Sequence, residues 1–295
     1  MSKEPAIETY ELTKYYGKIR GIEGLDLQVE KGDFFGFIGP NGAGKSTAIR
    51  TLLGLIKKTS GSAKVLGYDI SEEKEKILEN TGYLPSEIHF YSKMKVKDAI
   101  SYSAALRKKD CTKRATELSE RLDLDLNKRV EDLSLGNRKK VGIICAVQHH
   151  PDLLILDEPT SGLDPLMQKE FFSILKEENE NGSTIFFSSH ILSEVQAYCR
   201  SAAFIKEGKI LLSDKVGKLE QTGAKKVTIR GGVTKDDLTG LSGITYTEEN
   251  RQDALGFLYN GDINKLLTVL SNENVKDLTI TEPSLEEIFM HYYES

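Results

Sequence analysis

One glycine-rich stretch has the composition of a loop that binds phosphate groups. Residues 39–46 read Gly-Pro-Asn-Gly-Ala-Gly-Lys-Ser and match the pattern GxxxxGK[ST]. Glycines let successive backbone N–H groups turn inward around phosphate oxygens, and the lysine can reach the outer phosphates. The loop follows an apolar run and precedes a helical segment, as this chemistry requires. We expect these residues to line a phosphate site: Gly39, Pro40, Asn41, Gly42, Ala43, Gly44, Lys45, Ser46 and Thr47.

Two carboxylates end a second apolar run. Residues 153–158 read Leu-Leu-Ile-Leu-Asp-Glu. Beside a phosphate loop, Asp157 would hold Mg²⁺ through water and Ser46 would add a hydroxyl ligand. Glu158 would then lie where a water can attack the terminal phosphate, as a general base or as a water-orienting group. Acidic pairs at strand ends are common, but this pair beside this loop predicts hydrolysis of a phosphate anhydride.

The elements that must position these groups follow from the alternation of side chains. Residues 6–12 alternate as a strand does, and residues 25–29 alternate before the turn at 31–33. The apolar run 34–38 follows at once, so we expect a hairpin whose second arm is buried. These segments would form an N-terminal antiparallel β-subdomain.

Strands and helices alternate further along the chain. Strand-like runs at 153–156, 184–188 and 202–206 are separated by helical patterns near 166–178 and 191–198. Such alternation is typical of a parallel sheet that is covered on both faces. The fold class is therefore α/β with a P-loop NTPase core.

Two further regions complete the predicted architecture. Residues from about 92 to 150 have helical spacing and read as an inserted helical subdomain. From residue 218 onward, short alternating strands and two helical patterns, 262–270 and 284–293, indicate a small α+β unit, for which we expect a ferredoxin-like fold. We expect domains at 1–217 and 218–295.

Composition excludes several classes of protein. Forty basic and 45 acidic side chains among 295 residues give a net charge of −5, so no global positive field attracts nucleic acid. The apolar stretches 141–147 and 153–156 are far shorter than the ~20 residues that span a membrane. Three widely spaced cysteines, Cys111, Cys145 and Cys199, and no apparent signal segment indicate a reduced, cytoplasmic compartment.

The order of these motifs over about residues 5–215 resembles the ATP-binding subunits of ABC transporters. Residues 133–137 lie at the position of the LSGGQ signature, 161–164 resemble the D-loop, and 188–190 resemble the switch-histidine segment. Tyr16 resembles the aromatic residue that stacks on adenine, with Tyr15 as a close competitor. The resemblance implies ATP and Mg²⁺ as cofactors. It also implies that these residues contact nucleotide or its phosphates: Tyr16, Ser134, Gly136, Asn137, Asp164 and His190, the last as a catalytic residue with Glu158 and Lys45.

This sequence departs from the family pattern at two places. Ser86 stands where the family usually has the Q-loop glutamine, and a serine reaches less far toward the metal. Either Glu87 substitutes or a further water joins Ser86 in the metal shell; we favour the water. In the signature, Leu135 replaces a glycine and Asn137 replaces the glutamine, which leaves the Ser134 hydroxyl and the Gly136 backbone for phosphate contact.

The resemblance implies partners as well as a reaction. In the family, the signature of one subunit completes the ATP site of another, so we expect a head-to-tail dimer with a second copy or a homologous subunit. A separate membrane permease would carry the substrate, which places this chain at the inner face of the cell membrane. Residues 282–289 resemble the tail of exporter-type subunits, including the bacitracin and daunorubicin resistance groups. No nucleic acid is expected as a partner.

Two other functions compete with export. A soluble ABC ATPase that acts on ribosomes or DNA is the first alternative, but those branches usually carry two cassettes or long coiled coils. A P-loop kinase is the second, and it gives no reason for the signature or for His190.

Three surface features carry weaker expectations. Ile88, Phe90 and Tyr91 would either anchor a permease helix or pack into the helical subdomain. The basic clusters 107–109 and 138–140 read as solvated helix faces. Ser284 and Glu287 have the spacing of a capping box at the start of the last helix.

Overall fold

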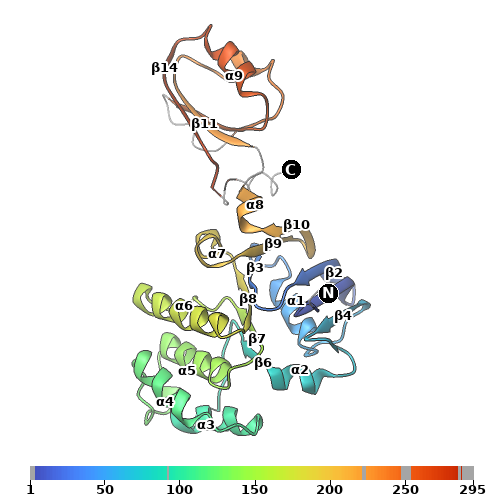
Figure 1. Ribbon diagram of the computed structural model, residues 1–295, viewed down its shortest axis with the longest axis vertical. Helices are drawn as coiled ribbons and strands as arrows, with labels where there is room; N and C mark the ends of the chain where they lie inside the picture. Colours follow the sequence, from blue (N-terminus) through green and yellow to red (C-terminus); the bar gives the residue numbers. More distant parts are fainter. Residues whose placement is uncertain (1–3, 92, 221–223, 247–253, 285–286, 288–295) are drawn as a thin grey trace. The chain divides into compact units, whose positions relative to one another are not determined.

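The computed structural model describes residues 4–91, 93–220, 224–246, 254–284 and 287 (Figure 1). The chain divides into two compact units, Met1–Ser213 and Asp214–Ser295. The predicted domain boundary after residue 217 lies four residues beyond this division. Each unit is described by itself below.

A six-stranded sheet forms the centre of the first unit, in the order β10-β9-β3-β8-β7-β6. The strands are β3 (Phe34–Ile38), β6 (Thr81–Leu84), β7 (Leu153–Asp157), β8 (Thr184–Ser189), β9 (Ser201–Lys206) and β10 (Lys209–Lys215). The five strands from β9 to β6 run parallel, and every residue of β3, β7 and β8 is buried. Parallel strands end at one edge of the sheet, so the segments after β3, β7 and β8 meet there.

Helices cover both faces of this sheet, as Figure 1 shows. Helix α1 (Lys45–Leu52) contacts β7 and also β2 and β4, while α5 (Leu135–Val147) packs on β6 and α6 (Pro165–Glu180) packs on β8. Two shorter helices, α2 (Lys74–Asn80) and α7 (Leu192–Tyr198), lie against β6 and β3. A core with both faces covered explains the continuous apolar runs of these strands.

The N-terminal strands form a separate antiparallel sheet in the order β2-β1-β4-β5. Its strands are β1 (Ile7–Tyr16), β2 (Ile19–Val29), β4 (Ser60–Val65) and β5 (Tyr68–Asp69). The expected hairpin between 25–29 and 34–38 is therefore wrong, because β2 pairs with β1 whereas β3 pairs with β8 and β9. The turn at Gly32 reverses the chain but does not determine the partner of β3, whose five buried residues need a cover on both faces.

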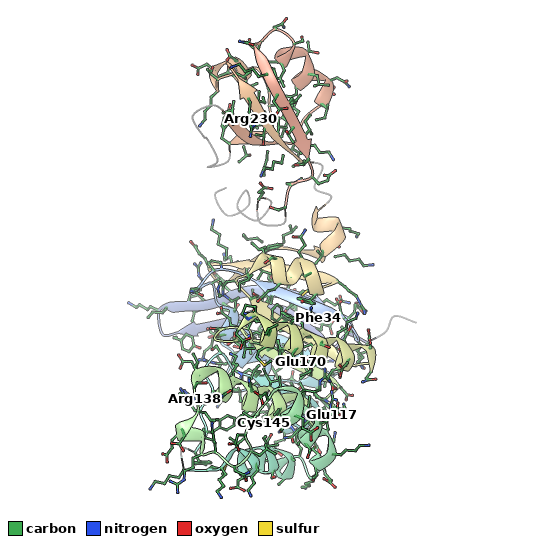
Figure 2. The ribbon with its side chains drawn as sticks, turned by 90° about the vertical axis from the view of Figure 1, so that its left-hand side faces the viewer. Phe34, Glu117, Arg138, Cys145, Glu170 and Arg230 are labelled. Atoms are coloured by element: carbon green, nitrogen blue, oxygen red, sulfur yellow. The ribbon has the colours of Figure 1, made fainter. Side chains whose placement is uncertain are left out.

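The segment between β6 and β7 is helical. It contains α3 (Val96–Leu106), α4 (Thr112–Arg121), the 3₁₀ turn η1 (Val130–Asp132) and α5, and both α3 and α4 pack on α5. Glu117 on α4 and Glu170 on α6, labelled in Figure 2, both approach the guanidinium of Arg121, at 3.8 and 2.7 Å. Arg121 also makes a two-bond pair with Glu177 at 2.6 and 2.7 Å, so α4 and α6 are joined by ion pairs.

The second unit is a four-stranded antiparallel sheet with the order β12-β13-β11-β14. Its elements are α8 (Val216–Glu220), β11 (Lys225–Gly231), η2 (Asp236–Leu238), β12 (Ile244–Tyr246), β13 (Ala254–Tyr259), α9 (Ile263–Leu270) and β14 (Val275–Thr281). Leu266 and Leu270 of α9 share a core with Val227 and Phe257 of the sheet. From β11 onward the sequence follows β-α-β-β-α-β, with the first helix reduced to η2. The α+β expectation is confirmed.

The predicted last helix, 284–293, lies largely outside the described residues. At its start, the Ser284 hydroxyl accepts a bond from the Glu287 N–H at 3.3 Å, and the Glu287 carboxylate accepts one from the Ser284 N–H at 2.8 Å. The predicted capping box is therefore confirmed. In the described part of the chain, no helix combines the length and the apolar character needed to span a membrane.

Candidate nucleotide site

The glycine-rich loop joins β3 to α1 and needs glycine for two physical reasons. Gly42 and Gly44 have φ angles of 80° and 106°, which residues with a side chain rarely adopt. A Cβ on Gly44 would also lie 2.5 Å from the carbonyl oxygen of Gly21. The loop is thus packed closely against the start of β2, and α1 begins directly behind it at Lys45.

A cavity of about 420 Å³ opens beside this loop. Its size falls in the range of small-molecule sites. Several predicted site residues line it, from four separate segments of the chain. They are Tyr16, Asn41, Gly42, Gly44, Lys45, Ser46, Thr47, Ser86 and Glu158. Of the two competing aromatic residues, it is Tyr16 that lines the cavity, with 46% of its surface exposed for stacking.

Lys45 is buried at the bottom of the loop. Its Nζ donates to the carbonyl oxygens of Gly39 at 2.6 Å and Pro40 at 3.1 Å, and lies 3.1 Å from Glu158 Oε1. The ammonium therefore connects the loop to the end of β7. A cation held in this way concentrates positive charge where phosphate oxygens would lie.

The Glu158 carboxylate lies between two nitrogens. One oxygen faces Lys45 Nζ, and the other lies 3.3 Å from His190 Nδ1. Glu158 has a φ of 47°, a left-handed conformation that costs a residue with a side chain roughly 1–3 kcal/mol. Its N–H donates to the backbone oxygen and the hydroxyl of Ser188, at 3.2 and 3.1 Å, which holds the strained residue in place.

Asp157 is fully buried one residue earlier. Its Oδ1 accepts a hydrogen bond from the Ser188 hydroxyl at 2.9 Å, whereas its Oδ2 has no partner among the described residues. Burial, and next the charge of Asp157, raise the pKa of Tyr83. A buried carboxylate oxygen without a donor is suited to a cation or a water that the cation binds.

Sequence reasoning missed Ser188, which connects Asp157 to Glu158 through its hydroxyl. Its signals in the sequence are a polar residue at the end of the strand 184–188 and its place two residues before His190.

Sequence reasoning was wrong about Lys139, which belongs to the basic cluster expected to be a solvated face. Its side chain is 3% exposed. Its Nζ donates to the carbonyl oxygens of Ser86 at 3.2 Å and Glu158 at 3.1 Å. Burial lowers the pKa of this ammonium, although the charges of Asp157 and Glu158 oppose the shift. A signal was available, because Lys139 lies four residues before the buried Ile143 and so falls on the inner face of α5.

The signature residues lie elsewhere. Ser134 is the N-cap of α5, and its hydroxyl accepts a bond from the Asn137 N–H at 3.3 Å. Asp164 is the N-cap of α6 and accepts from the N–H groups of Leu166 and Met167 at 3.0 Å. None of the four residues assigned by the resemblance to the signature and D-loop lines the cavity of this chain. They are Ser134, Gly136, Asn137 and Asp164.

The apolar cluster after Ser86 is split between the two predicted roles. Ile88 is half-buried, and its Cδ1 lies so close to Gly142 of α5 that a Cβ there would meet it at 2.4 Å. Tyr91 is 72% exposed. Ile88 therefore packs into the helical region, while Tyr91 remains available for a partner.

The parallel sheet, the phosphate loop at its edge and the acidic pair after β7 define a P-loop nucleoside triphosphatase. The ABC transporter family matches residues 22–161. An uncharacterized ABC transporter ATP-binding protein of Bacillus subtilis, YhaQ, is 36% identical, with 95% of each chain covered. The bacitracin transport ATP-binding protein BcrA of Bacillus licheniformis is 35% identical, with 96% of each chain covered.

A solved structure has the same fold. The structure of an ATP-binding subunit of an ABC transporter superposes with a TM-score of 0.70 and 27% identity, over 73% of this chain and 92% of the other. The chain belongs to the ABC transporter family, as one of its ATP-binding proteins, and is an ATPase. The resemblance and the P-loop fold class expected from the sequence are both confirmed.

Proposed function

We propose that this ATPase powers the export of a substrate through a separate membrane permease. Two observations support the proposal. The bacitracin transport protein BcrA is similar along 96% of this chain, and no described helix could span a membrane, so the path for a substrate would come from another subunit. The chain would then act at the inner face of the cell membrane, where Tyr91 offers an exposed ring to a permease.

The observation that carries the catalytic assignment is the position of the Glu158 carboxylate between Lys45 and His190. In this proposal, Lys45 contacts the outer phosphates of ATP and Glu158 orients or activates the attacking water. His190 contacts the terminal phosphate, since its ring is half exposed and lies 3.3 Å from the same carboxylate. Tyr16, which also lines the cavity, stacks on the adenine.

The residues present fit a bound Mg²⁺. The Asp157 Oδ2 atom is buried with no donor among the described residues, and Ser46 offers a hydroxyl inside the cavity. Ser86 lines the same cavity and would belong to the outer part of the metal shell through water. Mg²⁺ would supply charge neutralisation of the phosphates. The protein's own contribution is to keep Asp157 fixed through its bond to Ser188.

The position of the signature supports a head-to-tail dimer. Ser134, Gly136, Asn137 and Asp164 do not line the cavity of their own chain, although the resemblance assigns them to a nucleotide. A second copy, or a homologous subunit, that presents these residues to the cavity would complete it. ATP would then favour closure because its terminal phosphate contacts both subunits, and hydrolysis would remove those contacts.

Glu158→Gln tests the catalytic assignment. The amide keeps the size of the side chain but loses the negative charge, so ATP binding should persist while hydrolysis falls by about 100-fold or more. Glu180→Gln is the matched control, since Glu180 lies at the exposed end of α6. Hydrolysis by Glu158→Gln at the wild-type rate would remove Glu158 from the mechanism.

Capture of the tagged Glu158→Gln protein with ATP tests the transport assignment. Solubilised membranes of the source cells should yield a stoichiometric multi-spanning protein together with it. Recovery with ribosomes or nucleic acid, and without any membrane protein, would instead support the soluble alternative.

A further inference from the structure

Lys139 is buried beside the hydrolytic end of β7 but lies on a different element, α5. Arg138, labelled in Figure 2, marks the turn of α5 that carries it. We propose that Lys139 is a positioning residue for ATP hydrolysis, whose ammonium ties α5 to the backbone of Glu158 and of Ser86 and so fixes the Glu158 carboxylate. This inference rests on the proposed role of Glu158.

The contacts of Lys139 are directed at backbone atoms on two sides of the cavity. Two of the three ammonium N–H donors are used, one on the Ser86 carbonyl at 3.2 Å and one on the Glu158 carbonyl at 3.1 Å. Both residues line the nucleotide cavity. Since the side chain is 97% buried, these bonds are protected from competition with water.

The bond to Glu158 acts on a strained residue. The left-handed φ of Glu158 is stable only when its surroundings hold it, and the two sides of the residue are held by different partners. Ser188 accepts from its N–H, and Lys139 donates to its carbonyl oxygen. Without Lys139 the Glu158 carbonyl would keep only the longer bond from the Ser161 N–H, at 3.4 Å, and the carboxylate would be held less firmly between Lys45 and His190.

The same helix carries the signature at its N-terminus. Ser134 caps α5, and Gly136 in its first turn lies so close to the D-loop that a Cβ would meet the Gly162 carbonyl at 3.0 Å. About one helical turn therefore separates the residues that would face a partner's ATP from the residue that holds Glu158. Lys139 therefore connects the helix that carries the signature to the backbone of Glu158.

The test compares Lys139→Met with Lys139→Gln and with Lys140→Met as the matched control. Methionine keeps an unbranched apolar side chain, one atom shorter than lysine, and removes the donors. Glutamine has the same length as methionine and keeps two N–H donors without the charge. Lys140 is the next residue on α5 and lines a surface hollow with Asp123 and Asp125. Steady-state ATPase kinetics, nucleotide affinity and the thermal unfolding midpoint are measured for each variant.

A positioning role predicts a loss in kcat alone. Lys139→Met should lower kcat by about tenfold or more while KM and ATP affinity change by less than about twofold, because a misplaced group slows chemistry without weakening binding. Lys139→Gln should fall between wild type and Lys139→Met, and Lys140→Met should match the wild type. A purely structural lysine would instead lower stability and leave the kcat of the folded protein unchanged.

Two results would overturn the proposal. The first is a folded Lys139→Met with the kcat of the wild type. The second applies if Lys139→Met does not fold. Lys139→Gln with wild-type kcat and affinity would then show that the lysine is a packing residue. A lowered kcat of Lys139→Gln at unchanged affinity would support positioning. The Glu158→Gln experiment separates this outcome from failure of the proposed function, since that variant loses hydrolysis whether or not Lys139 matters.

Discussion

The Lys45 ammonium lies 3.1 Å from a carboxylate oxygen of Glu158, so one cation joins the phosphate loop to the acidic end of β7. An ammonium has three donors, and two of those of Lys45 are directed at the carbonyls of Gly39 and Pro40. The third faces Glu158. A terminal phosphate that binds Lys45 competes for this donor, which would release the Glu158 carboxylate for a water.

Lys45→Met tests whether Lys45 binds the phosphates of ATP. It removes a charge-assisted contact to phosphate, so ATP affinity should fall by about 10- to 100-fold. Equilibrium binding of a fluorescent ATP analogue measures the change. Lys176→Met, at an exposed position of α6, serves as control and should bind ATP as the wild type does. An unchanged affinity in Lys45→Met would contradict the assignment of the loop lysine.

Ser86→Gln tests the altered metal shell. The bond from Lys139 goes to the Ser86 backbone, so a longer side chain leaves that bond in place. The amide oxygen of glutamine would reach a metal that, in the proposed site, the serine would contact only through water. We expect hydrolysis to persist and the Mg²⁺ concentration for half-maximal activity to fall by about twofold or more, in a Mg²⁺ titration of ATPase rate. Loss of hydrolysis would mean that the Ser86 hydroxyl has a direct role.

The sequence predicted the groups that lie close together along the chain. The loop residues 39–46 and the pair Asp157 and Glu158 could be found because each motif is continuous and follows a recognisable strand. Lys139 and Ser188 could not be assigned in this way, since their roles depend on contacts with residues that are 19 and 31 positions away.

The same limit applies to the strands. The alternation in residues 25–29 and the apolar run 34–38 indicate that both segments are extended, but they do not show that the two strands belong to different sheets. The predicted exposure of the basic cluster 138–140 was wrong for Lys139 for a related reason. A run of basic residues does not show which face of a helix packs against a neighbour. Only the helical spacing from Lys139 to Ile143 carried that information.

Arg121→Met tests the contact between α4 and α6. Arg121 donates three charge-assisted bonds to Glu170 and Glu177 and is about one quarter exposed. With allowance for solvent screening, its loss should lower the free energy of unfolding by about 1–2 kcal/mol, and less at high salt. Urea unfolding at two salt concentrations measures both effects. Arg129→Met, at an exposed pair with Glu131, should change stability by less than about 0.5 kcal/mol.

His149 makes stability depend on pH. Burial, and next the charges of Arg107 and Lys109, lower its pKa to about 3. In the unfolded chain an ordinary histidine has a pKa of about 6.5, so below that pH the unfolded state binds the additional proton. Stability contributed by the neutral ring is complete above pH 6.5 and declines as the pH falls toward 3.

His149→Leu isolates this effect. Between pH 7 and pH 5 the wild type should lose about 2 kcal/mol of unfolding free energy more than the variant does, by urea unfolding at each pH. His89→Gln, at an exposed position, should follow the wild type. An equal loss in wild type and His149→Leu would show that His149 is protonated in the folded protein.

The most direct test of the account is the mass of Glu158→Gln in solution with ATP. Light scattering should give the mass of a dimer with Mg²⁺ and ATP and the mass of a monomer with ADP, because only the terminal phosphate would join the two subunits. Addition of Ser134→Arg to the same chain should restore the monomer without loss of ATP binding, since in the proposed dimer Ser134 would face the partner's nucleotide. A monomer that holds ATP, or a dimer that is indifferent to Ser134→Arg, would contradict the head-to-tail mechanism.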